Sequence, residues 1–216
     1  MKKIHLIDCG LGNLKSVSNA FEILDCKTVI CSSPGQLKDS THIILPGVGS
    51  FNEGIIKLNE SGLSEGIVSA VKSGSKLLGI CLGMQFLFDK SYEFGENEGL
   101  HLIPGKVQKM DLSEHKLRIP HIGWNDTFII KDDPLFNGLR NPTCFYYINS
   151  FSCICDNSEN ILGEYEYGNK FVAIVRKDKV FGVQFHPEKS HKEGLKILSN
   201  FIKDYAEKTF NTSPSS

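Results

Sequence analysis

The stretch "KLLGICLGMQFLF", residues 76–88, places an apolar run, a cysteine and an apolar helical pattern in direct succession. Gly79 and Gly83 stand two residues before and two residues after Cys81. This is the G-x-C-x-G pattern of a nucleophile elbow, a sharp strand-to-helix turn whose small flanking residues let strand and helix pass closely. The start of a helix favours a thiolate there. The pattern predicts either a reactive cysteine or a buried cysteine that packs as a small hydrophobe.

Strand and helix patterns alternate along the first half of the chain. The segments that predict buried strands are 2–8, 27–31, 41–46 and 75–80. The segments with apolar residues at helical spacing are 12–24, 51–58, 62–74 and 83–93. Such alternation is typical of a parallel sheet covered by helices on both faces, so we expect an α/β fold.

The second half consists mostly of strand-like pieces separated by short turns. They occupy 105–110, 120–130, 143–151, 160–168, 170–178 and 179–187, and a helical pattern follows at 191–208. These pieces predict antiparallel additions to the same sheet. No break in composition separates the halves. We therefore expect a single domain over residues 1–207 and a disordered tail at 208–216.

The bulk composition is that of an ordinary globular protein. The chain has 216 residues, 40% of them hydrophobic, and a formal net charge of −1. This balance gives no electrostatic reason to expect nucleic acid or a membrane as partner. The N-terminal "MKKIHLIDCG" meets Asp8 too soon for a signal peptide. Seven scattered cysteines lack a C-x-x-C pair, and no histidine spacing suits a metal. We expect reduced thiols in a cytoplasmic protein without metal or cofactor.

Two glycine-rich stretches follow predicted strands. In "GLGN", residues 10–13, the third glycine of a dinucleotide fingerprint is missing because Lys15 stands there, so a tight turn is predicted. "PGVGSF", residues 46–51, lacks the lysine of a phosphate-binding loop. Its backbone amides, at the start of a predicted helix, are placed to hold an anion or an oxyanion.

A second chemical motif lies in "VFGVQFHPEKS", residues 180–190, where a strand ends in His186-Pro187-Glu188. An imidazole at the carboxyl end of a strand lies in the crevice where open α/β sheets keep their sites. A carboxylate two residues on can orient it. A lone histidine is more often structural than catalytic. Together with the elbow at Cys81, however, this motif favours a catalytic triad.

The motifs "GICLGMQFLF" and "VQFHPEKS" resemble the class I (triad) glutamine amidotransferases. "DCGLGNLKSV", "LPGVGSF" and "IPHIGWN" narrow the resemblance to the glutaminase subunits of imidazole glycerol phosphate synthase, an enzyme of histidine biosynthesis. The resemblance runs from about residue 3 to residue 205. It implies the flavodoxin-like fold of that class, with a mostly parallel central sheet, helices on both faces and antiparallel additions in the C-terminal half.

The resemblance also implies roles for individual residues. Cys81 would attack the glutamine carboxamide, with His186 as proton donor and base and Glu188 as its support. The oxyanion would be held by Leu82 and by the Gly47-Val48-Gly49 loop. Residues implied to bind substrate are Gln85, Glu93, Asn149, Ser150 and Phe151. Residues implied at the partner interface are Asn13, Pro120, Trp124, Asn125, Tyr146 and Lys189.

The implied partner is a separate (β/α)8-barrel cyclase subunit. It would receive ammonia through a tunnel and make imidazole glycerol phosphate and AICAR. For three of the residues a plainer interpretation stays open. Trp124 could fill the core, and Gln85 and Glu93 could be solvated residues of a helix.

One stretch departs from the family. Where Tyr-Phe-Val-His-Ser-Tyr is usual, residues 146–151 read Tyr-Tyr-Ile-Asn-Ser-Phe, so Asn149 replaces a histidine. We expect the glutamine chemistry to survive, because an amide also donates and accepts hydrogen bonds. The pathway is less determined. A sister glutaminase that supplies ammonia for amidino groups on bacterial surface sugars is the alternative. A cysteine hydrolase would not explain "PHIGWN", and the intact triad argues against a non-catalytic subunit.

Overall fold

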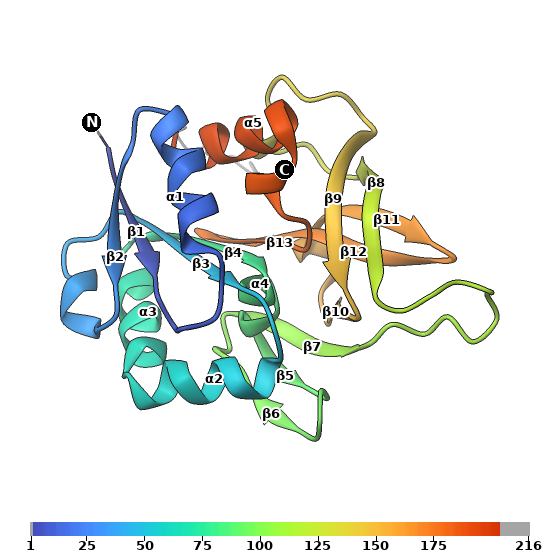
Figure 1. Cartoon of the computed structure of the whole chain (residues 1–216), viewed down its shortest axis with the longest axis horizontal. Coiled ribbons are helices and arrows are strands. Elements are labelled where there is room, and N and C mark those ends of the chain that lie inside the picture. Colours follow the sequence, from blue (N-terminus) through green and yellow to red (C-terminus); the bar gives the residue numbers. More distant parts are fainter. Residues whose placement is uncertain (1, 204–216) are drawn as a thin grey trace, which may run out of the picture.

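The computed structural model describes residues 2–203. Its main sheet has nine strands in the order β2-β1-β3-β4-β13-β12-β11-β8-β9 (Figure 1). Their bounds are β1 (Lys3–Ile7), β2 (Lys27–Cys31), β3 (His42–Gly47), β4 (Lys76–Cys81), β8 (His121–Ile129), β9 (Thr143–Asn149), β11 (Ile161–Tyr167), β12 (Asn169–Lys177) and β13 (Val180–Val183). The strands from β2 to β13 in this order are parallel, and the remaining pairs are antiparallel. The predicted sheet, parallel at its centre with antiparallel additions, is confirmed.

Helices cover both faces of this sheet. α1 (Leu14–Ile23) and α5 (His191–Phe201) lie on one face, and α2 (Phe51–Glu60) and α3 (Leu63–Lys72) lie on the other (Figure 1). The short helix α4 (Leu82–Phe86) follows β4 directly. The described residues also form four 3-10 turns: η1 (Pro34–Leu37), η2 (Pro134–Phe136), η3 (Ser158–Asn160) and η4 (Pro187–Lys189).

Alternation of side chains along the central strands explains these two layers. Ile44 of β3 and Leu78 of β4 belong to the core that contains Phe21 of α1 and Leu198 of α5. Their neighbours along each strand, such as Ile43, belong to the second core, together with the apolar residues of α2 and α3. A strand that is apolar at every position therefore needs a helical layer on both sides, as its composition predicted.

Two expectations about secondary structure were wrong. The helical pattern over 83–93 stops at Phe86, because Phe88–Ser91 forms strand β5 and pairs with β7 (Ile103–Lys109). In addition, β7 and β10 (Phe151–Cys155) do not extend the main sheet. They form a second, four-stranded sheet with β5 and β6 (Asn97–Glu98). Pairing with distant strands overrides the local period here, because a short apolar run suits a strand as well as a helix.

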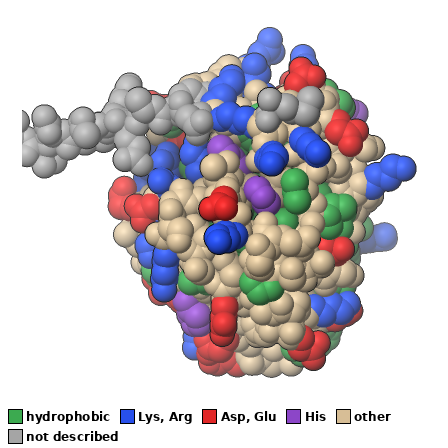
Figure 2. All heavy atoms as spheres, turned by 90° about the vertical axis from the view of Figure 1, so that its left-hand side faces the viewer, with side chains coloured by type: hydrophobic (Ala, Val, Ile, Leu, Met, Phe, Trp, Pro, Cys, Tyr) green, Lys and Arg blue, Asp and Glu red, His purple; other side chains and the backbone are tan. Residues whose placement is uncertain are grey.

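Other features bear on the remaining expectations. All seven cysteines are free thiols. No helix among residues 2–203 is long and apolar enough to cross a membrane. Figure 2 shows one face of the molecule, where basic and acidic side chains are interspersed. The tail expected at 208–216 lies outside the described residues, and the single domain over 1–207 stays a prediction.

Candidate active site

Cys81 occupies a strained turn between β4 and α4. Its backbone has φ 54° and ψ −109°, a conformation that costs an L-residue free energy and is concentrated at functional sites. The two flanking glycines make the turn possible. A Cβ on Gly79 would lie 2.5 Å from the carbonyl oxygen of Gly83, and a Cβ on Gly83 would lie 1.7 Å from that of Leu45. The backbone of α4 therefore lies in direct contact with those of β4 and β3, which is the geometry of a nucleophile elbow.

The sheet register places Cys81 among residues from distant parts of the sequence. In the parallel ladders, Gly47 of β3 pairs with Cys81, and Val183 of β13 pairs with Ile80. Cys81 thus lies at the carboxyl edge of the sheet, between the "PGVG" loop and the residues that follow β13. Open α/β sheets hold their ligands at this edge.

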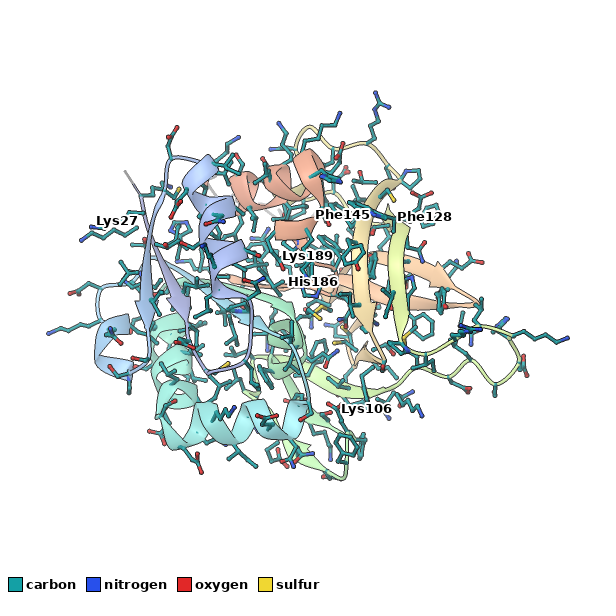
Figure 3. All side chains as sticks on the ribbon, viewed as in Figure 1. Lys27, Lys106, Phe128, Phe145, His186 and Lys189 are labelled. Carbon is teal, nitrogen blue, oxygen red and sulfur yellow. The ribbon has the colours of Figure 1, made fainter. Side chains whose placement is uncertain are left out.

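His186 and Glu188 follow β13 at the same edge. His186 Nδ1 lies 2.8 Å from Glu188 Oε1, and both side chains are buried. Because Nδ1 is engaged by the carboxylate, the other ring nitrogen is left to interact with Cys81. His186 lies beside Lys189 near the middle of the molecule, below α5 in Figure 3. The structure therefore brings the three residues of the predicted triad together.

The electrostatics of His186 follow from these neighbours. Burial alone would lower its pKa, because the charged imidazolium loses water. Cys81 and Glu188 act in the opposite direction through charge and hydrogen bonding, and together they raise the pKa of His186 to about 10. A histidine held beside a cysteine and supported by a carboxylate is the arrangement that activates a thiol as a nucleophile.

The loop expected to hold an oxyanion lies against the start of α4. A Cβ on Gly47 would meet Leu82 Cβ at 3.0 Å and the backbone nitrogen of Gly83 at 3.2 Å. Val48 is exposed, and Gly49 has φ 104°, a conformation that favours glycine. Leu82 is the first residue of its helix, so its N–H has no acceptor within the helix. The two predicted sources of amide donors are therefore adjacent.

Gln85 and Glu93 are both buried, so the interpretation of either as a solvated residue was wrong. Gln85 Nε2 donates to the carbonyl oxygen of Phe151 at 3.4 Å and to Gln184 Oε1 at 3.3 Å. Glu93 lies between β5 and β6, where its Oε2 accepts a hydrogen bond of 2.6 Å from the backbone nitrogen of Phe51. Burial raises the pKa of Glu93. That carboxylate thus contacts the first residue of α2, two positions beyond Gly49.

Asn149 lies in a buried polar cluster behind the cysteine. Its Nδ2 donates to Tyr165 Oη at 2.9 Å and to the carbonyl oxygen of Phe151 at 3.1 Å. Its Oδ1 is buried without a hydrogen-bond partner among the described residues. Ser150 is half-buried, and its carbonyl oxygen accepts from the backbone nitrogen of Met110. The side-chain amide of Asn149 therefore takes part in hydrogen bonding at the position where the family has a histidine.

The chain resembles known proteins over nearly its full length. Residues 5–205 match the model of the family described as glutamine amidotransferase class-I. Imidazole glycerol phosphate synthase subunit HisH of Sulfurimonas denitrificans is 46% identical over 202 residues, which cover 93% of this chain and 97% of that protein. Subunit HisH 1 of Campylobacter jejuni serotype O:23/36 is 44% identical, over 93% of this chain and 99% of its own. The chain belongs to the class I glutamine amidotransferases and, among them, to the HisH subunits.

Solved structures support the fold of this glutamine amidotransferase. A crystal structure of a glutamine amidotransferase has a TM-score of 0.70 at 19% identity and covers 92% of this chain and 96% of its own. The structure of PurLQS from Thermotoga maritima has a TM-score of 0.74 at 21% identity, over 93% of this chain and 97% of that one. The predicted family and fold class are confirmed.

Among the residues expected at the partner interface, Tyr146 lies against Trp124, which is 49% exposed and so is not core filling. The indole stacks on His191 with 5.0 Å between ring centroids and meets the ring of Tyr146 edge-on at 5.7 Å. Lys189 Nζ lies 5.9 Å from the centroid of the Tyr146 ring. His191 is the first residue of α5, where the sequence predicted a helix to begin. An exposed aromatic cluster beside a lysine is typical of an interface anchor.

Three further residues expected at the interface have structural roles of their own. Asn13 caps α1, where its Oδ1 accepts from the backbone nitrogen of Ser16. Pro120 follows a cis peptide bond and precedes β8. Asn125 Nδ2 donates to the carbonyl oxygen of Glu166 at 2.8 Å. A hollow of about 540 Å³ between β8 and the end of β11 is lined by Asn125 and Trp124.

Gln184 is a residue of the site that was not predicted from the sequence. Gln184 Nε2 lies 3.7 Å from Cys81 Sγ, and the side chain of Gln184 is fully buried. The only signal in the sequence is its place in "VQFHPE", two residues before His186. A polar residue directly after a buried strand could have been suspected. Its contact with Cys81 could not, because 103 residues separate the two.

A prediction about pH follows from the His186–Glu188 pair. Glu188→Gln keeps an oxygen that can accept from His186 but removes the negative charge. Because Glu188 helps to raise the pKa of His186 to about 10, we expect that pKa to fall in the variant by roughly one to two units. The imidazolium then loses its proton at a lower pH, so the alkaline limb of the pH–rate profile for glutamine hydrolysis shifts downward. Initial rates across the neutral and alkaline range measure the shift.

The matched control is Glu193→Gln, which makes the same charge change on α5, where Glu193 pairs with Lys192. We expect it to leave the alkaline limb in place. An alkaline limb that stays in the wild-type position in Glu188→Gln would contradict the assigned role of Glu188.

Proposed function

We propose that this chain hydrolyses glutamine to glutamate and ammonia with Cys81, His186 and Glu188. The ammonia passes to a (β/α)8-barrel cyclase subunit, which makes imidazole glycerol phosphate and AICAR in histidine biosynthesis. The observation that carries the proposal is the buried cysteine–histidine–glutamate arrangement on a strained elbow. It occurs in a chain that shares 46% of its residues with a HisH subunit over nearly its full length.

The first half of the reaction is acylation of Cys81. The thiolate attacks the side-chain carboxamide carbon of glutamine, a C–S bond forms, and the carbonyl electron pair moves to oxygen. Leu82 N–H and an amide of the Gly47–Gly49 loop hold this oxyanion. His186 then gives its proton to the nitrogen, the C–N bond breaks, and ammonia departs.

The second half is hydrolysis of the thioester. His186, now neutral, takes a proton from water, and the resulting hydroxide attacks the acyl carbon. The C–S bond breaks, its electron pair returns to sulfur, and glutamate leaves. Glu188 stabilises the imidazolium that forms again, because its carboxylate lies 2.8 Å from Nδ1.

Recognition of glutamine needs groups for its ammonium, its carboxylate and its carboxamide. Glu93 is a buried carboxylate next to the oxyanion loop and complements the ammonium. Gln85, Asn149, Ser150 and Phe151 line the same side of the site, where peptide and side-chain amides can bind the rest of the substrate. Asn149 keeps a hydrogen-bonding role in place of the family's histidine.

The proposed partner face, formed by Trp124, Tyr146 and Lys189, is joined to the triad through Tyr146. Its ring meets Trp124, and its carbonyl oxygen accepts a 2.9 Å hydrogen bond from the backbone nitrogen of His186. Its own backbone nitrogen donates to Ser190 Oγ at 3.0 Å. A cyclase bound over Trp124, Tyr146 and Lys189 would therefore contact the segment that carries His186. Such a soluble pair of biosynthetic subunits would act in the cytoplasm.

The test of this function is reconstitution. We expect the isolated chain to be a poor glutaminase, because ammonia is wasted unless a partner receives it. Adding the histidine-pathway cyclase of the same organism with its ligand should raise glutamine turnover at least about tenfold, or roughly 1.4 kcal/mol of barrier. Glutamate and imidazole glycerol phosphate are measured together. Trp124→Ala should weaken this complex and leave the low turnover of the isolated chain unchanged.

The relatives named above favour the histidine pathway over a surface-sugar pathway. Full turnover by the isolated chain would contradict the dependence on a partner. If the chain formed no complex with the histidine-pathway cyclase but was activated by a diverged barrel, the surface-sugar pathway would be the better assignment.

A further inference from the structure

Gln184 lies beside the sulfur of Cys81 for a reason that the strand pairing makes clear. β13 and β4 are parallel neighbours, and Val183 pairs with Ile80. The next residues on the two strands are Gln184 and Cys81, so their side chains emerge next to each other. The backbone nitrogen of Gln184 also bonds to the carbonyl oxygen of Ala173 at 2.8 Å, which holds this residue to β12.

Hydrogen bonding determines which end of the Gln184 amide faces the sulfur. The carbonyl oxygen of Phe151 can only accept, so Gln85 must direct its Nε2 toward it, at 3.4 Å. The second hydrogen of that Nε2 then points to Gln184 Oε1, at 3.3 Å. Gln184 is left with its Nε2 toward Cys81 Sγ, at 3.7 Å. A backbone carbonyl thus orients two buried amides in series.

We propose that Gln184 is a further catalytic residue, whose amide N–H donates to Cys81 sulfur and stabilises the thiolate. This inference rests on the proposed function and adds a group to its site. No proton moves from Gln184 in either half-reaction. During acylation the sulfur electron pair enters the C–S bond and the hydrogen bond weakens. When the thioester breaks, the pair returns to sulfur, and the N–H stabilises the leaving thiolate.

An amide suits this position better than a second charged donor. His186 already supplies the proton and the positive charge beside Cys81. A neutral donor lowers the free energy of the thiolate without competing with His186 for the proton or with Glu188 for the imidazolium. Its burial excludes water, which would otherwise compete for the sulfur.

The test measures the thiol directly in the full-length protein. Wild type, Gln184→Met and Gln184→Glu are alkylated with iodoacetamide across a pH series, and mass spectrometry follows the modification of Cys81. Methionine has a similar length and no donor, so the pH midpoint of reactivity should rise by about one unit and glutamine turnover should fall about tenfold. Glutamate keeps the shape but places a carboxylate beside the sulfur, so its midpoint should rise at least as far.

Asn200→Leu is the matched control. Asn200 is a buried amide of α5 that donates to the carbonyl oxygens of Leu135 and Asn137, away from Cys81. Whatever it does to stability, this variant should keep the wild-type midpoint. Thermal unfolding identifies variants that fail to fold, and Gln184→Glu decides the question if Gln184→Met is one of them.

An unchanged midpoint in a folded Gln184 variant, even with reduced turnover, would overturn the proposal and leave Gln184 a packing residue. Alkylation requires neither glutamine nor the cyclase. If the wild type hydrolysed no glutamine, the proposed function would fail while the alkylation series still decided the role of Gln184.

Discussion

Cys81→Ala is expected to lower glutamine hydrolysis by at least about 10⁴-fold, because removal of the nucleophile from a covalent mechanism eliminates the acyl-enzyme route. The fold should survive, since the change removes one sulfur from a large apolar core. Binding to the cyclase should survive too, because Cys81 is buried, whereas the proposed interface centres on the exposed Trp124. Glutamate release and complex formation are measured on the same preparation.

The chain offers a matched control in Cys144, a free cysteine that is exposed on the edge strand β9. Cys144→Ala should retain wild-type turnover. A glutamine-directed electrophile such as diazo-oxo-norleucine should modify Cys81 and none of the other six cysteines. Labelling at another position, or substantial turnover by Cys81→Ala, would remove Cys81 from the mechanism.

Gly83→Ala is the second change with a large expected effect. The new Cβ would lie 1.7 Å from the carbonyl oxygen of Leu45, a backbone atom of β3 that cannot rotate away. Either β3 or α4 must move, and both elements hold groups of the site. A displacement of about 1 Å at a catalytic group costs on the order of 10²-fold in rate, and overpacking destabilises by about 1–3 kcal/mol. We expect at least that loss of turnover with a lowered melting temperature.

Gly35→Ala is the control for this substitution. Gly35 lies in η1, and a Cβ there would have no atom within 4 Å. Its turnover and melting temperature should match the wild type. If Gly83→Ala retained both wild-type values, the elbow would not need the close approach that the structure indicates.

The sequence alone was sufficient for the parts of the protein that local patterns encode. The apolar runs of the first four strands and the helices between them were predicted with boundaries close to those observed. The elbow around Cys81 was predicted too, because only glycine fits where strand and helix touch. The pair His186 and Glu188 was recognisable because it, too, is encoded in a short stretch of sequence. The histidine and its carboxylate are two residues apart, so their contact is a local property of the chain.

Tertiary structure decided what depends on pairing between distant segments. Phe88–Ser91 is a strand because β7 lies beside it, although its own residues also suit a helix. Gln85, for which a solvated position was left open, is buried, and its amide donates to Phe151 and Gln184. The stack of Trp124 on His191 joins β8 to α5. None of these contacts has a signal in the local sequence.

The contact between Gln184 and Cys81 shows the physical reason most directly. The sequence determined that a cysteine would sit at the end of one strand and a polar residue at the end of another. Only the parallel pairing of β4 with β13 made them neighbours, across 103 residues of chain. Side-chain periodicity reports which face of an element is buried, but not which element lies opposite. That choice is made by packing of the whole sheet, where the free energy of burial is summed over all of its strands.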